Sequence, residues 1–142
     1  MVRAFLPLLV LLVGCASAAS STEELPVPSR HPLDLPIIGR LTITENGIGS
    51  PPDQNVPRHC SAFQLDETQV RRFIGMADGI DRRDYMHTLD WSPCHARGRV
   101  EFEDGRKGTW TIRRFQTGSI LFDDNGEVFL FCPDCSWKPF VW

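Results

Sequence analysis

Four cysteines in the C-terminal part of this chain constrain its fold more than any other feature. The 142-residue sequence has five cysteines, and four of them follow residue 57: Cys60, Cys94, Cys132 and Cys135. In a small exported domain an even number of cysteines predicts disulfides, because the core is marginal and each bridge contributes about 2–4 kcal/mol. Cys60 can pair with Cys94, which leaves Cys132 to pair with Cys135, or the two bridges can be crossed.

The first residues have the pattern of an export signal. One positive charge, Arg3, precedes an apolar run from Ala4 to Val13. This run suits the core of a signal peptide and is shorter than the roughly 20 residues of a membrane-spanning helix. Pro7 interrupts the run, which disfavours a buried helix. We therefore expect residues 1–14 to be removed as a signal peptide.

Cys15 follows in a short sequence, LVGC, that resembles the lipobox of bacterial lipoproteins. The resemblance implies that Cys15 becomes the first mature residue and carries acyl chains, each stabilised by about 0.8 kcal/mol per buried CH₂ group. No aspartate follows Cys15, so the signal for retention at the inner membrane is missing. The expected location is therefore the periplasmic face of the outer membrane. Ordinary cleavage near Ala16 and Ala18 is the alternative, and it would give a soluble periplasmic or secreted protein.

Residues 15–57 have the composition of a tether. Seven of the 11 prolines lie in this stretch. Proline fixes φ and lacks a backbone donor, so it favours extended polyproline geometry over helix. Residues 37–44 differ, because their β-branched side chains are typical of a strand that can add to the sheet of the following domain.

Residues 66–79 predict one amphipathic helix. Asp66 can cap its N-terminus, with Gln69 in the capping-box position. Apolar residues recur at the spacing of one helical face: Val70, Phe73, Ile74 and Ala77. Gly79 is expected to mark the end of the helix.

Three later segments have the apolar–polar alternation and turn residues of paired strands: 98–105, 109–115 and 119–132. Asp104 and Gly105 predict one turn, and Asn125 with Gly126 predicts a type I′ turn in which both residues have positive φ. For residues 58–142 the predicted fold is α+β. One amphipathic helix packs on an antiparallel meander of three to five strands, and disulfides staple the two together.

The net charge of the chain limits the classes of molecule that we expect it to bind. There are 15 basic and 18 acidic residues, for a net charge of −3. Basic residues occur in pairs, but acidic residues lie close to each pair. This composition disfavours nucleic acids and anionic lipid surfaces as partners. Apart from the membrane reached through the lipid anchor, the expected partner is another protein.

No group of residues in the sequence matches a catalytic or cofactor site. A hydrolytic site needs a nucleophile, a base and an orienting acid. The nearest match lies in residues 85–95, which include His87, Asp90, Ser92 and His95, but Ser92 has no nucleophile motif around it. Residues 123–127 lack the spacing of a calcium loop and suit a hairpin turn. We expect no cofactor, no bound metal and no enzymatic activity.

The Cys-Pro-Asp-Cys motif at Cys132–Cys135 supports two alternatives. It resembles a thiol–disulfide exchange site, although catalytic versions place the first cysteine at a helix N-terminus and Cys132 ends a predicted strand. Zinc is the second alternative, because His59 and His95 adjoin Cys60 and Cys94 in ligand-like pairs. In an oxidising compartment we expect disulfides instead.

Three aromatic residues lie close to the C-terminus of the chain: Trp137, Phe140 and Trp142. We expect them to pack across the sheet, since exposed termini are more often polar. If they stay exposed, they form a candidate binding patch, because aromatic side chains carry much of the energy of protein interfaces.

From Cys60 onward, several short motifs follow one another: C-x-x-F, V-R-x-F, D-W-x-P-C, F-x-D-G-x-x-G-x-W-x-I and C-x-x-C. In this set the chain resembles a family of small cysteine-containing exported lipoproteins of Gram-negative bacteria, a family that implies no particular activity. A lipobox followed by a small disulfide-bonded domain is also similar, in general build, to periplasmic immunity lipoproteins and lysozyme inhibitors.

These features together favour an envelope-tethered lipoprotein with a small protein-binding domain, an inhibitor or an immunity factor. The first alternative is a periplasmic thiol-redox or zinc-binding accessory protein that uses Cys132 and Cys135. The second is a structural envelope lipoprotein with no discrete ligand.

Overall fold

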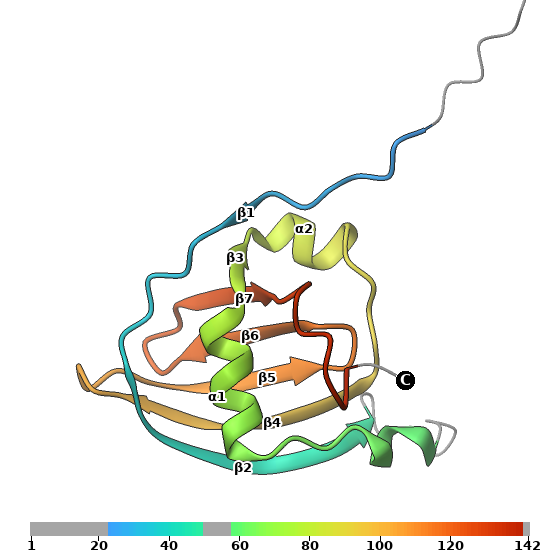
Figure 1. The fold of residues 1–142 in the computed structure, drawn as a ribbon. Coiled ribbons are helices and arrows are strands. Elements are labelled where there is room, and N and C mark those ends of the chain that lie inside the picture. The colour runs from blue at the N-terminus through green and yellow to red at the C-terminus, as the bar shows by residue number, and fades with distance from the viewer. Residues whose placement is uncertain (1–22, 50–57, 141–142) are drawn as a thin grey trace, which may run out of the picture.

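The computed structural model describes residues 23–49 and 58–140, which form a seven-stranded antiparallel sheet with helices packed against it (Figure 1). The strands are β1 (Arg30–His31), β2 (Ile38–Gly49), β3 (Asp78–Ile80), β4 (Cys94–Phe102), β5 (Lys107–Arg113), β6 (Thr117–Phe122) and β7 (Glu127–Phe131). The helices are α1 (Glu67–Met76), α2 (Arg82–His87) and the 3-10 helix η1 (Arg58–Ala62). None of these helices is long and apolar enough to cross a membrane.

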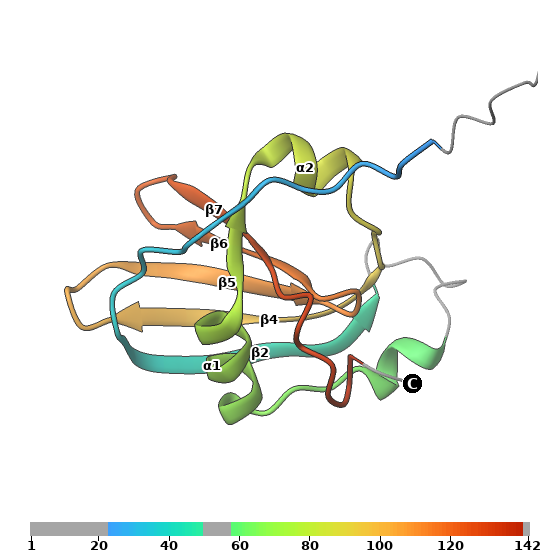
Figure 2. The same cartoon turned by 45° about the horizontal axis from the view of Figure 1, so that its top comes forward.

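The strand order is β1-β3-β7-β6-β5-β4-β2, and α1 crosses one face of the sheet (Figure 2). The predicted α+β class and the antiparallel meander, β4 to β7, are confirmed. Two details were wrong, since the sheet has more than three to five strands and a second helix is present. The extra elements β1, β3 and α2 are too short to give a periodic signal in the sequence.

All three hairpins of the meander have the same loop. Each has three residues between the last paired residues, and the third has positive φ: Gly105 (89°), Gln116 (62°) and Asn125 (71°). Such loops, a turn followed by one left-handed residue, are common between antiparallel strands. The turn at Asn125 is therefore where it was predicted, but it is not type I′, because Gly126 does not have positive φ.

Helix α1 begins with the predicted capping box. The Asp66 carboxylate accepts a hydrogen bond from the Gln69 N–H at 2.8 Å, and the Gln69 side chain accepts one from the Asp66 N–H at 2.9 Å. The helix ends at Met76 rather than near Gly79. Residues 78–80 leave it because they pair with β7, so long-range strand pairing overrides the local signal of the glycine.

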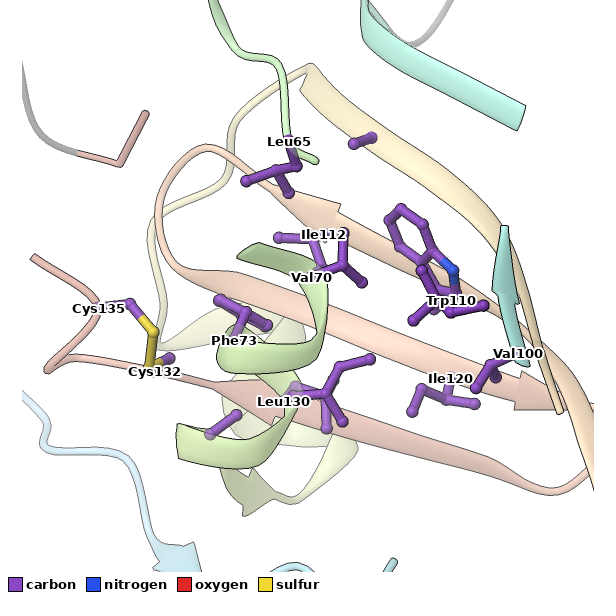
Figure 3. Close-up of a cluster of buried hydrophobic side chains, with 14 of the residues drawn as sticks. Leu65, Val70, Phe73, Val100, Trp110, Ile112, Ile120, Leu130, Cys132 and Cys135 are labelled. Atoms are coloured by element: carbon purple, nitrogen blue, oxygen red, sulfur yellow. A yellow bond between two sulfur atoms is a disulfide. The ribbon is translucent and has the colours of Figure 1, made fainter. Parts of the chain in front are cut away.

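The core lies between α1 and the sheet (Figure 3). Val70, Phe73 and Ile74 of the helix are buried against the sheet. The sheet contributes alternate residues of its central strands, among them Val100, Trp110, Ile112, Ile120 and Leu130, all of them buried. Burial of this many large apolar side chains supplies the main stabilising term of the domain.

The segment assigned to the tether is partly paired in the sheet. Residues 37–44 fall almost entirely within β2, a long edge strand that pairs with β4. Residues 30 and 31 form β1 and pair with β3 at the opposite edge. The sheet therefore includes strands from both sides of the expected boundary between residues 57 and 58. Strands β1 and β2 precede this boundary and pair with β3 and β4, which follow it.

The cysteines form the uncrossed pair of disulfides, Cys60–Cys94 and Cys132–Cys135. The first joins η1 to the start of β4 across 34 residues of sequence. The second closes the short loop after β7. All four cysteines are buried, so both bridges belong to the packed interior.

Candidate functional site

One end of the sheet gathers segments that are distant in the sequence. Strand register places the start of β4, the end of β5, the start of β6 and the end of β7 beside one another. In Figures 1 and 2 this is the right-hand end, where η1, the segment before β4 and the C-terminal segment also lie. Both disulfides lie here too, since Cys94 begins β4 and Cys132 follows β7.

Trp91 is the most prominent side chain at this end, with 58% of its surface exposed. The Arg113 guanidinium lies 5.4 Å from the centre of its ring, in a cation–π contact. Arg113 also donates a hydrogen bond to the Ser92 carbonyl at 3.1 Å. Ser92 is buried, and its hydroxyl accepts a hydrogen bond from the Cys94 N–H at 3.2 Å. The exposed indole is therefore attached to a rigid, disulfide-bonded base.

The β5–β6 loop adds a second exposed aromatic side chain, Phe115, which is 39% exposed. The next residue, Gln116, fixes this loop to the Cys132–Cys135 loop. Its side-chain amide donates to the Cys135 carbonyl at 2.9 Å and to the Pro133 carbonyl at 3.3 Å. We call the side chains of Trp91, Arg113 and Phe115 the β5–β6 rim.

A pocket of about 380 Å³ opens at the same end of the sheet. It is lined by Ala62, Phe63, Gln64, Gln69, Arg114, Lys138 and Pro139. Among the described residues of this lining, two are cations and none is acidic. Burial lowers the pKa of the Arg114 guanidinium below its usual value, because desolvation disfavours the charged form.

Two residues of the candidate binding patch at the C-terminus, Trp137 and Phe140, are among the described residues. Phe140 is buried, with its ring 5.5 Å from that of Phe63 and 5.3 Å from that of Phe73. Trp137 is half-buried, and the Arg72 guanidinium lies 4.8 Å from its ring. Packing of this segment against the core, the favoured expectation, therefore holds for Phe140.

Two of the predicted site residues, Cys15 and Trp142, lie outside the described residues. For Cys15 the lipobox of the sequence stays the basis of the prediction. For Trp142 the choice between packing and exposure stays open in the same way.

The Cys132–Cys135 disulfide is shielded from solvent, since neither residue has exposed surface. Cys132 follows β7 and does not begin a helix. The environment of this disulfide differs from that of thiol-exchange sites, where the first cysteine lies at a partly exposed helix N-terminus. All four thiols proposed as zinc ligands are bonded in disulfides, and the described residues contain no cluster of three potential metal ligands.

The residues considered for hydrolysis are not arranged as a nucleophile and base. Ser92 is buried, and its hydroxyl oxygen accepts a hydrogen bond from the Cys94 N–H. His95 is also buried; its Nε2 lies 3.0 Å from a Glu45 carboxylate oxygen and its Nδ1 lies 3.3 Å from the Pro93 carbonyl. His87 and Asp90 are exposed. These contacts assign Ser92 and His95 to the packing of the segment before β4.

The rim and the pocket include residues that sequence reasoning did not select. Trp91 was not among the candidate residues, yet its ring is exposed. No local sequence signal marks Trp91, because the exposure of its ring depends on whether another element covers it. Arg113, Arg114 and Lys138 carry no such signal, since strand register alone brings the β5–β6 loop to this end.

The comparisons with known proteins give no relative. No protein-family model, no curated protein sequence and no solved structure matches this chain.

Proposed function

We propose that this chain is an envelope-tethered lipoprotein whose folded domain binds another protein through the β5–β6 rim. Cys15 supplies the lipid anchor at the periplasmic face of the outer membrane. The domain acts by occupying a surface of its partner, as an inhibitor or an immunity factor does, and performs no reaction of its own.

The exposed ring of Trp91 carries this proposal. Tryptophan and arginine are the residues most enriched among those that dominate the energy of protein interfaces. Trp91 and Arg113 are in contact, and Phe115, also exposed, lies two residues after Arg113 in the β5–β6 loop. An exposed indole costs solvation free energy in the free protein and recovers it when a partner covers the ring.

The rigidity of the base supports the same conclusion. Cys94, bridged to Cys60, begins β4 three residues after Trp91, and its N–H donates a hydrogen bond to the Ser92 hydroxyl. Gln116 holds the loop that carries Phe115. A surface that is fixed before binding loses little conformational entropy on binding, so more of the contact energy appears as affinity.

Native mass spectrometry of the protein extracted gently from its own envelope tests this proposal. The expected species is an acylated chain with four oxidised cysteines and one bound protein. Trp91→Ala should lose the bound protein and keep the acyl mass. Leu121→Ala is the matched control, because Leu121 is also a large exposed apolar side chain, 44% exposed, but lies in β6 away from the rim.

Two results would overturn parts of the proposal. Retention of the same bound protein by Trp91→Ala would remove the rim as its binding surface. Cys15→Ser should yield a chain with no acyl mass, and an unmodified mass for the native chain would remove the lipid anchor. The two parts are thus tested separately.

A further inference from the structure

The N-terminal segment crosses the width of the domain before it enters β2. Strands β1 and β2 form opposite edges of the seven-stranded sheet, and residues 32–37 connect them along one side of the domain (Figures 1 and 2). We call residues 29–36 the strap. Neighbouring strands lie about 4.8 Å apart, so the two edges of the sheet are separated by roughly 30 Å. The two ends of the strap are therefore attached to distant parts of the fold.

The polar contacts that hold the first part of the strap lie at the surface. The Ser29 N–H donates a hydrogen bond to an Asp84 carboxylate oxygen at 2.8 Å, and both residues of β1 are exposed. Arg30 forms an ion pair with Asp78 at 3.2 Å, in which the two side chains are 45% and 40% exposed. Ion pairs of this kind contribute little to stability, because water screens them. The backbone pairing of β1 with β3 covers only two residues.

The second part of the strap packs loosely on α1. Leu33 and Leu35 are half-buried against the edge of the core. The same two leucines line a pocket of about 370 Å³, which Ile74 and Ala77 of α1 line from the other side. Side chains that face an open pocket make fewer dispersion contacts than those in a close-packed interior. The strap is therefore held more weakly than the central strands.

The packed core does not depend on the strap. Among the described residues, Leu41 of β2 is the first that is buried. The start of β2 also has attachments of its own. The Glu103 N–H donates to the Ile37 carbonyl at 2.9 Å, and the Arg71 guanidinium donates to the Ile38 carbonyl at 3.1 Å. These bonds hold β2 in the sheet whether or not the strap is docked.

We propose that the strap is a releasable part of the tether, which detaches from the domain while the sheet and α1 stay folded. Segments with few buried apolar contacts and exposed hydrogen bonds open with a smaller free energy than global unfolding requires. When the strap is docked, the preceding chain is attached to the domain at the edge formed by β1 and β3. When the strap is released, the attachment moves to β2 at the opposite edge.

The consequence of release for the anchored protein rests on the proposed function, because it requires the lipid at Cys15. Ser29 is 14 residues after Cys15, and Ile38 is 23 residues after it. An extended chain spans at most about 3.3–3.6 Å per residue, so release adds up to about 30 Å to the reach of the domain. The released form therefore meets a partner farther from the membrane than the docked form does.

Native-state hydrogen exchange of the ¹⁵N-labelled, full mature chain with Cys15→Ser tests the release without the anchor. The amides of Ser29 and β1 report on the strap, and those of Trp110 and Ile112 in β5 report on the sheet. We expect the protection of the strap amides to be lower by about a hundredfold or more, because they exchange through local opening. Low concentrations of urea should accelerate exchange in β5 far more than in the strap, since release exposes little surface.

Matched variants locate the contacts that hold the strap. Leu35→Ala removes a half-buried side chain, so it should accelerate exchange of the Ser29 amide about tenfold and leave Trp110 unchanged. Arg30→Gln removes the exposed ion pair and should accelerate Ser29 by about fivefold at most. Leu25→Ala is the control, because Leu25 precedes the strap and is 84% exposed, and it should change neither amide.

Three results would overturn the proposal. Equal protection and equal urea dependence of Ser29 and Trp110 would show that the strap and the sheet open together. Absence of protection at Ser29 and β1 would show that the strap is not docked. An equal acceleration of both amides by Leu35→Ala would show that the sheet depends on the strap. These measurements use neither the lipid nor a partner, so the strap can pass its test while the anchor or the rim fails.

Discussion

The side-chain amide of Gln116 donates a hydrogen bond to the backbone carbonyl of Cys135 at 2.9 Å, and this contact joins the two loops that frame the rim. The bond is reinforced from the other side, where the Cys132 N–H donates to the Gln116 carbonyl at 2.9 Å. Gln116 makes these contacts from a left-handed backbone conformation, with φ of 62°. A residue other than glycine pays a conformational cost there, so its side chain must compensate.

Two replacements of Gln116 distinguish the stability contributed by its side-chain hydrogen bonds from the cost of its left-handed backbone conformation. Gln116→Ala removes both side-chain hydrogen bonds and keeps the strain, so we expect the free energy of unfolding to fall by about 1–3 kcal/mol. Gln116→Gly removes the same bonds but relieves about 1–2 kcal/mol of strain, and it should be the more stable of the two variants. Equilibrium unfolding in urea measures both. Equal stability of Gln116→Ala and the native chain would contradict this role.

Asn46 ties the edge strand β2 to the segment that leads into α1. Its side chain donates to the Leu65 carbonyl and accepts from the Leu65 N–H, both at 2.9 Å. Because Leu65 is buried, Asn46→Ala leaves its backbone groups poorly satisfied, and we expect a loss of about 2 kcal/mol in unfolding free energy. Thr44→Ala on the same strand removes one exposed hydrogen bond and should cost about 0.5 kcal/mol or less. Similar losses for the two variants would rule out this special role of Asn46.

The burial of Cys132 and Cys135 predicts how their disulfide responds to reductant. Since neither residue has exposed surface, an attacking thiolate reaches the bridge only after local or global opening. We expect the rate of reduction, followed by trapping of the released thiols, to rise with denaturant in parallel with unfolding. Fast reduction in the absence of denaturant would instead support the thiol-redox alternative.

Asp84 predicts a pH dependence for the docking of the N-terminal segment. The Ser29 N–H donates to its carboxylate at 2.8 Å and the Thr88 hydroxyl donates at 2.9 Å, and these bonds lower the pKa of Asp84. A lowered pKa means that the carboxylate stabilises this docking above its ordinary pKa of about 3.9. The contribution is lost as the pH falls through the lowered value.

The amide proton of Ser29 reports this titration. Its chemical shift should move as Asp84 is protonated, with a midpoint below the ordinary value of an aspartate. In Asp84→Asn the same signal should not respond to pH over that interval. A midpoint at or above the ordinary value would show that the Ser29 bond does not stabilise the ionised form.

The parts of the fold that depend only on residues close together in the sequence could be predicted. The capping box of Asp66 and Gln69 involves residues three apart, and the hairpin turn at Gly105 needs only its own loop. The end of α1 could not be placed, because residues 78–80 pair with a strand about 50 residues later. The pairing of Arg30 with Ile80 escapes local reasoning for the same reason.

The candidate site was harder to predict than the fold. Aromatic side chains near the C-terminus were the candidates, but Phe140 packs against Phe63 and Phe73. Trp91 and Phe115, which were not candidates, are exposed. Exposure of an aromatic residue depends on whether another element covers it, and only the assembled sheet decides that. The pairing of Cys60 with Cys94 was one of the open alternatives for a similar reason.

Photo-cross-linking in intact cells tests the central claim most directly. A photoreactive amino acid replaces Asp90 in one strain and Leu121 in another, since both positions are exposed but only Asp90 adjoins Trp91 of the rim. The account predicts one protein adduct from position 90 that is absent from position 121 and is lost when Trp91→Ala is added. Equal adducts from both positions, or none from position 90, would contradict a binding role for this end of the sheet.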